Sequence, residues 1–186
     1  MLEREIENEK NVLERAIRGE SSAFGLLYDK YQPKIFRFIF LKVSNREEAE
    51  DLTHQVFLSA WQNIGRFKDE GLPLSSWLYA IARNRVIDFY RTKKRTESID
   101  ENTDDVLTLA TATLEDDVIH KIDLESVYKA LKSLPSEYQE IVIMRFVEGL
   151  NPSEISKATG KNQGAIRVIQ FRALQKLKKM LNNNHD

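Results

Sequence analysis

Glycine and proline are scarce in this sequence, and their scarcity limits the possible folds more than any other feature. Seven glycines and four prolines occur in 186 residues, whereas β-sandwiches and β-barrels need a tight turn after almost every strand. Apolar residues recur at helical spacing along most of the chain, and no segment alternates apolar and polar residues for long. The sequence therefore predicts an all-α fold.

An acidic stretch divides the chain. Residues 96–123 carry one basic residue against nine acidic ones, whereas residues 1–95 carry 17 basic against 14 acidic and residues 124–186 carry ten against six. The first part of this stretch is rich in Thr, Asp and Glu and has no sustained helical period. We predict two small helical bundles, residues 1–95 and 116–186, joined by a poorly ordered linker over 96–115. The acidic stretch is either a solvated linker or a mimic of nucleic acid inside a basic channel.

Several classes of protein are excluded or disfavoured by composition. The absence of cysteine excludes disulfides, a thiol nucleophile, iron–sulfur clusters and thiolate zinc sites. Three widely spaced histidines argue against a histidine-rich metal site, and no histidine or glycine-rich loop accompanies the clustered carboxylates. We therefore expect no enzyme activity, metal or cofactor. The charged N-terminus is no signal peptide, and no apolar run could span a membrane, so we expect a cytoplasmic protein without membrane insertion.

The helical pattern gives eight or nine segments. In the N-terminal bundle, a serine at 21 or 22 should cap the second helix, and Pro33 should break or kink it. Asn45 should cap the third helix, and Ser75 or Ser76 the last. The helices are expected over 3–18, from 21 or 22 to Pro33, over 35–43 and 46–63, and from 75 or 76 to about 94, then over 116–133, 135–148, 152–159 and 163–181.

The last two segments have the pattern of a helix-turn-helix. Asn151, Pro152 and Glu154 stand at the N-cap, N1 and N3 positions of a capping box. Gly160 follows where the turn needs a positive φ, and Ile166 falls at an expected core position. Taken alone, this spacing also occurs in many helical hairpins that bind no DNA.

The second helix of this motif strengthens the case for DNA binding. Side chains that suit base edges, including those of Asn162, Gln163, Arg167 and Phe171, point outward near its N-terminus. Lys161 and Arg172 are placed to meet phosphates. For the basic tail at 178 and 179, an ordinary solvated helix end is an equally good interpretation.

Residues 77–95 mix aromatic and basic residues and contain a single acid, Asp88. Basic side chains follow a phosphate backbone, and aromatic side chains stack on unpaired bases. We interpret Ile81 and Phe89 as core residues, and the basic run after Tyr90 as a nucleic-acid contact.

Three segments together resemble bacterial sigma factors of the extracytoplasmic-function group: EEAEDLTHQVFLSAWQNI (47–64), WLYAIARNRVIDFYR (77–91), and the long segment 134–174 that begins LPSEYQEIVIMRF. Their order and spacing agree with that family, and the likeness runs from about Ser22 to Leu181. The resemblance implies that the first bundle, sigma domain 2, binds the β′ clamp helices of core RNA polymerase and opens and reads the minus-10 element. It implies that the second, sigma domain 4, binds the β flap and reads the minus-35 element. An anti-sigma partner is also implied.

The resemblance also assigns residues by position. The implied polymerase contacts are Glu50, Asp51, His54, Gln55 and Phe57. The loop 66–74 corresponds to the segment that receives a flipped base. The implied minus-10 contacts are Arg66, Phe67, Trp77, Arg83, Asn84, Arg85 and Arg91. The implied minus-35 contacts are Lys161, Asn162, Gln163, Gly164, Arg167, Val168, Phe171 and Arg172.

The sequence departs from the family pattern at three places. His54 and Gln55 stand where Gln-Glu is usual, and Ala165 and Ile166 stand where Thr-Val is usual. Ser156 replaces the usual alanine in the helix-turn-helix, which is a change between small residues.

Two other classes of protein remain open from the residues alone. A dimeric helix-turn-helix repressor or activator would explain the C-terminal motif and leave the acidic start of the third helix without a role. A helical adaptor would predict no salt-dependent binding to DNA.

Overall fold

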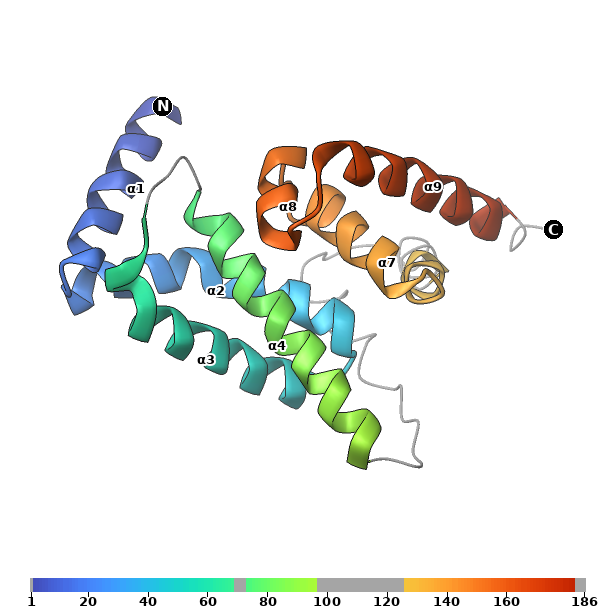
Figure 1. Cartoon of the computed structure of the whole chain (residues 1–186), viewed down its shortest axis with the longest axis horizontal. Coiled ribbons are helices and arrows are strands. Elements are labelled where there is room, and N and C mark those ends of the chain that lie inside the picture. Colours follow the sequence, from blue (N-terminus) through green and yellow to red (C-terminus); the bar gives the residue numbers. More distant parts are fainter. Residues whose placement is uncertain (1, 69–72, 97–125, 183–186) are drawn as a thin grey trace, which may run out of the picture.

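The computed structural model describes residues 2–68, 73–96 and 126–182, and in these residues the only regular elements are helices (Figure 1). The predicted all-α fold is therefore confirmed. The first unit contains α1 (Leu2–Ile17), α2 (Ser21–Val43), α3 (Arg46–Asn63), the 3₁₀ turn η1 (Ile64–Arg66) and α4 (Leu74–Thr96). The second contains a helical segment at 126–132, α7 (Ser136–Val142), the π-helical turn η2 (Ile143–Val147), α8 (Pro152–Thr159) and α9 (Gln163–Asn182). The predicted linker over 96–115 lies almost entirely outside the described residues, as do residues 116–125 of the helix expected next.

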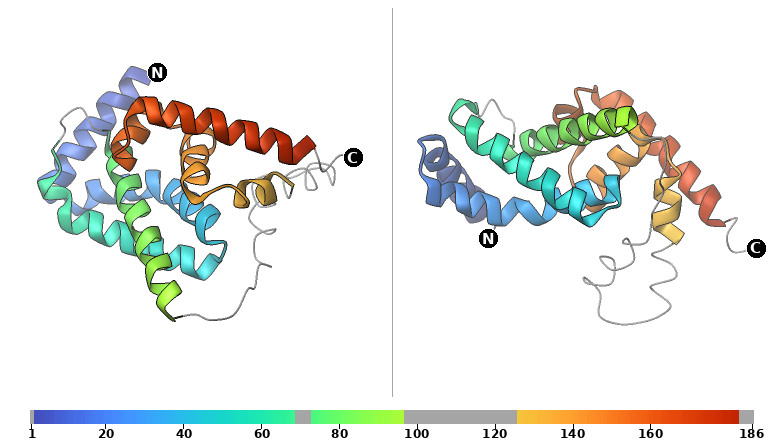
Figure 2. Two further views of the ribbon diagram at one scale, coloured as in Figure 1. Left: turned by 45° about the vertical axis from the view of Figure 1, so that its right-hand side comes forward. Right: turned by 90° about the horizontal axis from the view of Figure 1, so that it is seen from below.

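Helix α2 is the centre of the N-terminal unit. It packs against α1, α3 and α4, so its side chains are buried on more than one face (Figure 2). Ile35, Phe38 and Ile39 of α2 and Tyr79 of α4 are almost completely buried, and the Phe38 and Tyr79 rings meet edge to face at 5.4 Å between centroids. This aromatic packing fixes the position of α4, which carries most of the predicted minus-10 contacts.

Of the predicted break or kink at Pro33, the break is wrong, because α2 runs without interruption from Ser21 to Val43. Proline removes one helical hydrogen bond, but Tyr31 and Ile35 on either side of it are buried in the core. This packing holds both halves of the helix in place. The predicted serine cap is also wrong: Glu20 is the N-cap, and Ser22 donates its hydroxyl proton to the Glu20 carboxylate at 2.7 Å.

The capping signal for α3 was accurate, whereas the one for α4 was not. The Asn45 side chain accepts a hydrogen bond from the Glu48 amide at 2.9 Å, as predicted for the start of α3. By contrast, α4 begins at Leu74, so Ser75 and Ser76 lie in its first turn and are not its N-caps.

The C-terminal unit has the predicted helix-turn-helix. Asn151 and Glu154 form a complete capping box at the start of α8, and Gly160 has φ of 73° in the turn before α9. The helix expected over 135–148 ends instead in the π-helical turn η2, where the Glu148 amide donates to the Ile143 carbonyl at 3.0 Å. This turn directs the Glu148 side chain toward the N-terminal unit.

The two units pack directly on one another. Helix α4 lies beside α8, and α2 contacts η2 (Figures 1 and 2). None of the described helices is long and apolar enough to cross a membrane.

Candidate nucleic-acid interface

A cavity of about 300 Å³ opens where α3, η1 and α4 meet. Its aromatic wall consists of Phe67 and Trp77, whose ring centroids are 5.2 Å apart. Ser59, Asn63, Arg66 and Ile81 complete the lining. An aromatic wall with polar groups in the same lining suits a planar, unpaired base, and an exposed arginine suits its phosphate.

Local structure positions both rings. Phe67 caps η1, with its amide donating to the Ile64 carbonyl at 2.9 Å, and both Phe67 and Trp77 pack partly against the core. The structure therefore brings together three of the predicted minus-10 residues, Arg66, Phe67 and Trp77. Part of the loop 66–74, residues 69–72, lies outside the described residues.

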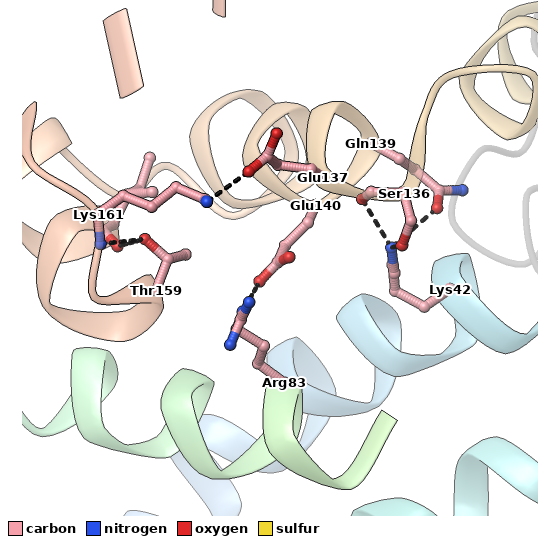
Figure 3. Close-up of polar contacts among 9 residues, drawn as sticks. Lys42, Arg83, Ser136, Glu137, Gln139, Glu140, Thr159 and Lys161 are labelled. Carbon is pink, nitrogen blue, oxygen red and sulfur yellow. Dashed lines mark hydrogen bonds and ion pairs between the residues drawn. The ribbon is translucent and has the colours of Figure 1, made fainter. Parts of the chain in front are cut away.

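The other predicted minus-10 residues follow α4 but do not form one surface. Asn84 and Arg91 are exposed, and Arg91 lies 3.2 Å from the Asp88 carboxylate in an exposed pair of little energetic value. Arg83 is only 25% exposed because it faces α7, where its guanidinium lies 2.5 Å from the Glu140 carboxylate (Figure 3). Arg85 is half-buried.

The predicted polymerase-binding residues divide between the surface and the core. Glu50, Asp51, His54 and Gln55 are exposed on α3. Phe57 is 4% exposed, and its ring meets that of Tyr28 at 4.8 Å, so we assign Phe57 to the core of the N-terminal unit.

Sequence reasoning missed two exposed apolar residues on the same helix. Leu58 is 58% exposed, and Trp61 is 38% exposed with its ring against that of Phe24. Leu58 follows His54 by four residues, and Trp61 follows it by seven, so both lie on the His54 face of α3. Helical spacing from His54 was the signal that could have identified them.

The recognition helix α9 presents its predicted reading face to solvent. Gln163, Gly164, Arg167 and Arg172 are exposed, as are Val168 and Phe171, the latter at 63%. Ile166 and Ala173 are buried on the opposite face, as the spacing predicted. The core residues and the proposed base-reading residues therefore lie on opposite faces of α9, as expected for a helix that enters a DNA groove.

Two of the predicted minus-35 residues also have structural partners. Asn162 accepts a hydrogen bond from the Ala165 amide at 2.8 Å, so its side chain caps α9. Lys161 forms an ion pair with Glu137 of α7 (Figure 3). Ser156, the unusual serine of the motif, donates its hydroxyl proton to the Lys161 carbonyl at 2.6 Å and so holds the turn between the two helices.

The contact between the two units contains charged residues that sequence analysis did not select. The Glu148 carboxylate is completely buried and accepts hydrogen bonds from Arg37 and Tyr79, while Lys42 contacts Ser136 and Gln139 of α7. Burial lowers the pKa of Lys42 to about 8, and burial also raises the pKa of the Glu140 carboxyl. No group of residues in the described part of the chain could hold a metal ion.

Comparison with known families agrees with this division into two units. The model of sigma-70 region 2 matches residues 27–96, and that of sigma-70 region 4 matches residues 130–179. The chain is 36% identical over 172 residues to the ECF RNA polymerase sigma factor BldN of Streptomyces coelicolor, covering 91% of this chain and 64% of that protein. It is 31% identical to SigD of Mycobacterium tuberculosis, another ECF sigma factor, covering 90% of this chain and 81% of SigD.

Two solved structures have a similar fold. The sigma factor RpoE from Bartonella quintana, in complex with the anti-sigma factor NepR, aligns with a TM-score of 0.69 at 22% identity, covering 86% of this chain and 96% of that one. CnrH, in complex with the cytosolic domain of CnrY, aligns with a TM-score of 0.72 at 19% identity, covering 94% and 97%.

Proposed function

The chain belongs to the extracytoplasmic-function group of RNA polymerase sigma factors, and from this we propose that it binds core RNA polymerase and directs it to specific promoters. The N-terminal unit would bind the β′ clamp helices and read the minus-10 element. The C-terminal unit would bind the β flap and read the minus-35 element. A sigma factor is a regulatory subunit and not the catalyst, so no covalent chemistry is required of these residues.

The cavity beside Phe67 and Trp77 is the observation that carries this proposal. It is aromatic, open, and lies within the segment that matches sigma-70 region 2. A helix-turn-helix repressor reads duplex DNA and needs no site for an unstacked base. A protein that helps to open a promoter does need one, because captured bases offset the cost of unstacking.

Each proposed surface has its own residues. On α3, Glu50, Asp51, His54 and Gln55 supply the polar contacts to polymerase, and Leu58 and Trp61 supply an apolar anchor. In the minus-10 site, Phe67 and Trp77 stack on a base. The remaining proposed contacts there are Arg66, Arg83, Asn84, Arg85 and Arg91.

On α9, the proposed base contacts are Gln163, Arg167, Val168 and Phe171, all exposed. Gly164 lets the backbone approach the groove, while Lys161 and Arg172 meet phosphates. We assign Asn162 chiefly to capping, because its side chain already accepts the Ala165 amide.

Regulation by an anti-sigma factor is part of the proposal. The RpoE structure, which shares the fold, contains a sigma factor bound to an anti-sigma factor. We propose a partner of this kind for the present chain, and a cytoplasmic location, because RNA polymerase acts there.

Transcription in vitro with core polymerase on genomic fragments tests the proposal. We expect defined start sites only when the chain and core polymerase are both present. A chain that binds duplex promoter DNA tightly by itself, and adds no start sites to core polymerase, would instead be a repressor or activator. The variant Trp77→Ala separates promoter opening from binding, since it should still form holoenzyme.

A further inference from the structure

A second cavity, of about 470 Å³, opens where α2, α4 and α7 meet. It shares no lining residue with the cavity beside Phe67 and Trp77. Its apolar wall consists of Phe38, Val86, Ile87, Tyr90 and Leu134. Phe38 is buried, whereas Ile87 is 45% and Tyr90 42% exposed, so this wall runs from the core to the surface. Close-packed interiors seldom leave such a space, and its volume is one that holds small organic molecules.

Three basic side chains line this cavity, together with a single carboxylate. The basic residues are Lys42 of α2, Arg83 of α4 and Lys132, which lies just before α7. Glu140 of α7 is the only acidic residue of the lining. Figure 3 shows Lys42 and Arg83 pointing from the N-terminal unit toward α7. Because charges held away from water need counter-charges or hydrogen bonds, the excess of positive charge favours an anionic ligand.

The surroundings of Lys42 reflect the same excess of positive charge. Its side chain is buried, and its three hydrogen bonds go to neutral acceptors of α7, each at 3.0 Å. The pKa of Lys42 is lowered to about 8, chiefly by burial. Glu140 opposes this lowering of the pKa, whereas the nearby positive charges of Lys132 and Arg83 add to it. One carboxylate therefore does not balance the three basic groups.

Lys132 and Arg83 both retain hydrogen-bond donors that a ligand could use. Lys132 Nζ donates to the Lys42 carbonyl at 2.9 Å, its one hydrogen-bond acceptor in the described part of the chain, whereas an ammonium group has three donors. Arg83 Nε and Glu140 Oε1 lie 2.5 Å apart but lack the geometry of a hydrogen bond, so both atoms are buried without a hydrogen-bond partner. A ligand oxygen can therefore bind here without displacing an existing hydrogen bond.

We propose that this cavity binds a small organic carboxylate. The charged end of the ligand binds Lys132 and Arg83. Its apolar body lies against Ile87 and Tyr90. A neutral ligand would not supply the missing negative charge, and an inorganic anion would leave the apolar wall in contact with water. The inference goes beyond the proposed function, because it makes the chain a receptor for a small organic acid whether or not it binds polymerase.

Isothermal titration calorimetry of the full chain with phenylbutyrate tests this proposal. The matched ligand is phenylbutyramide, which has a similar shape and no charge. We expect the carboxylate to bind about ten-fold or more tightly than the amide, as one charge-assisted hydrogen bond predicts. K132Q should weaken binding of the carboxylate by about five-fold to ten-fold and leave binding of the amide unchanged. The control K157Q, which removes an exposed lysine of α8, should bind both ligands as the wild type does.

The variant E140Q should change the affinity in the opposite direction. It removes the carboxylate that competes for Arg83 and keeps the size of the side chain, so phenylbutyrate should bind about three-fold or more tightly. Saturating phenylbutyrate should also raise the midpoint of thermal unfolding of the wild type, and should raise that of K132Q less.

If K132Q loses its helical circular dichroism, E140Q and the comparison of the two ligands decide. No binding of phenylbutyrate, equal affinities for the carboxylate and the amide, or an affinity for the carboxylate that neither variant changes would overturn the proposal. Since no polymerase is present, any of these results would leave polymerase-dependent transcription by the wild-type chain standing.

Discussion

Helices α9 and α4 both carry proposed DNA contacts, but these contacts differ in their exposure to solvent. The reading face of α9 points to solvent, with Phe171 63% exposed and Arg167 also exposed. On α4, Arg83 is covered by α7, and Tyr79, one helical turn before it, donates a hydrogen bond to Glu148. One surface is available in the free chain, while the other is partly occupied by the rest of the molecule.

The difference in exposure follows from the helices that α9 and α4 each pack against. Among the described helices, α9 packs mainly against α7 and α8, so one face suffices for its core residues Ile166 and Ala173. Helix α4 packs against α2, α3 and α8, so few of its positions remain free for DNA. The same α4 surface can contact either the rest of the chain or DNA. Binding to that surface can therefore be regulated by exchanging one contact for the other.

The largest expected effect is at the base pocket, which the C-terminal unit leaves open. Replacing Trp77 with alanine removes one of the two rings of its aromatic wall, and stacking of a base on an aromatic ring is worth about 1–3 kcal/mol. We expect open-complex formation to fall by roughly one to two orders of magnitude, measured by permanganate footprinting of the promoter. Trp77→Phe, which keeps a stacking ring, should recover most of this loss. Equal losses in holoenzyme formation would show that Trp77 is structural.

An effect in the same range is expected on α9. Replacing Arg167 with alanine should cost roughly 1–3 kcal/mol of promoter affinity if the side chain reads a base, and should relax preference at one minus-35 position. A phosphate contact would weaken all promoters alike and lower the salt slope by about one. The control K178A/K179A, at the exposed end of the helix, should have little effect. Unchanged transcription by Arg167→Ala at every promoter would refute the assignment of the recognition helix.

The smallest effect concerns Lys42 at the contact between the units. Its pKa is lowered to about 8 in the folded chain by burial, below the ordinary value of 10.5. Between these values the unfolded chain binds more protons, so stability rises with pH in this interval. We expect the free energy of unfolding in urea to increase by about 1 kcal/mol from pH 8 to pH 9, where few tyrosines are ionised because their ordinary pKa is about 10.

The variant K42M should show a smaller increase over the same range, because Lys132 alone then contributes: burial lowers its pKa as well. An increase as large as that of the wild type would place the titrating group elsewhere.

Three features set by neighbouring residues were predicted correctly from the sequence, although the serine caps expected for α2 and α4 were not. The caps at Asn45 and Asn151 and the turn at Gly160 each depend on residues within a few positions, and all three were placed correctly. The core side of α9 likewise follows from helical spacing. The break expected at Pro33 was wrong because distant core packing outweighed a local preference.

The contact between the units could not be predicted from the sequence. Glu148 is 111 residues from Arg37 and 69 residues from Tyr79 in the sequence. Because it precedes Gly149, its sequence context is that of an acidic residue in a solvated loop. Glu140 resembles a solvated helix residue until α4 is placed beside it. Phe57 likewise falls within the helix that the resemblance assigns to polymerase binding, and only its packing against Tyr28 shows that it is buried.

The distance between the two units, measured with and without core polymerase, tests the contact between them most directly. Because the chain contains no cysteine, the variant Q62C/Q175C can be labelled at only these two exposed positions, on α3 and α9, for electron–electron resonance spectroscopy. We predict one narrow, short distance in the free chain and a longer distance in the holoenzyme. With the same labels, E140Q/E148Q, which removes both carboxylates from this contact, should adopt longer distances even without polymerase. A free wild-type chain that already shows the distances of the holoenzyme would contradict this account.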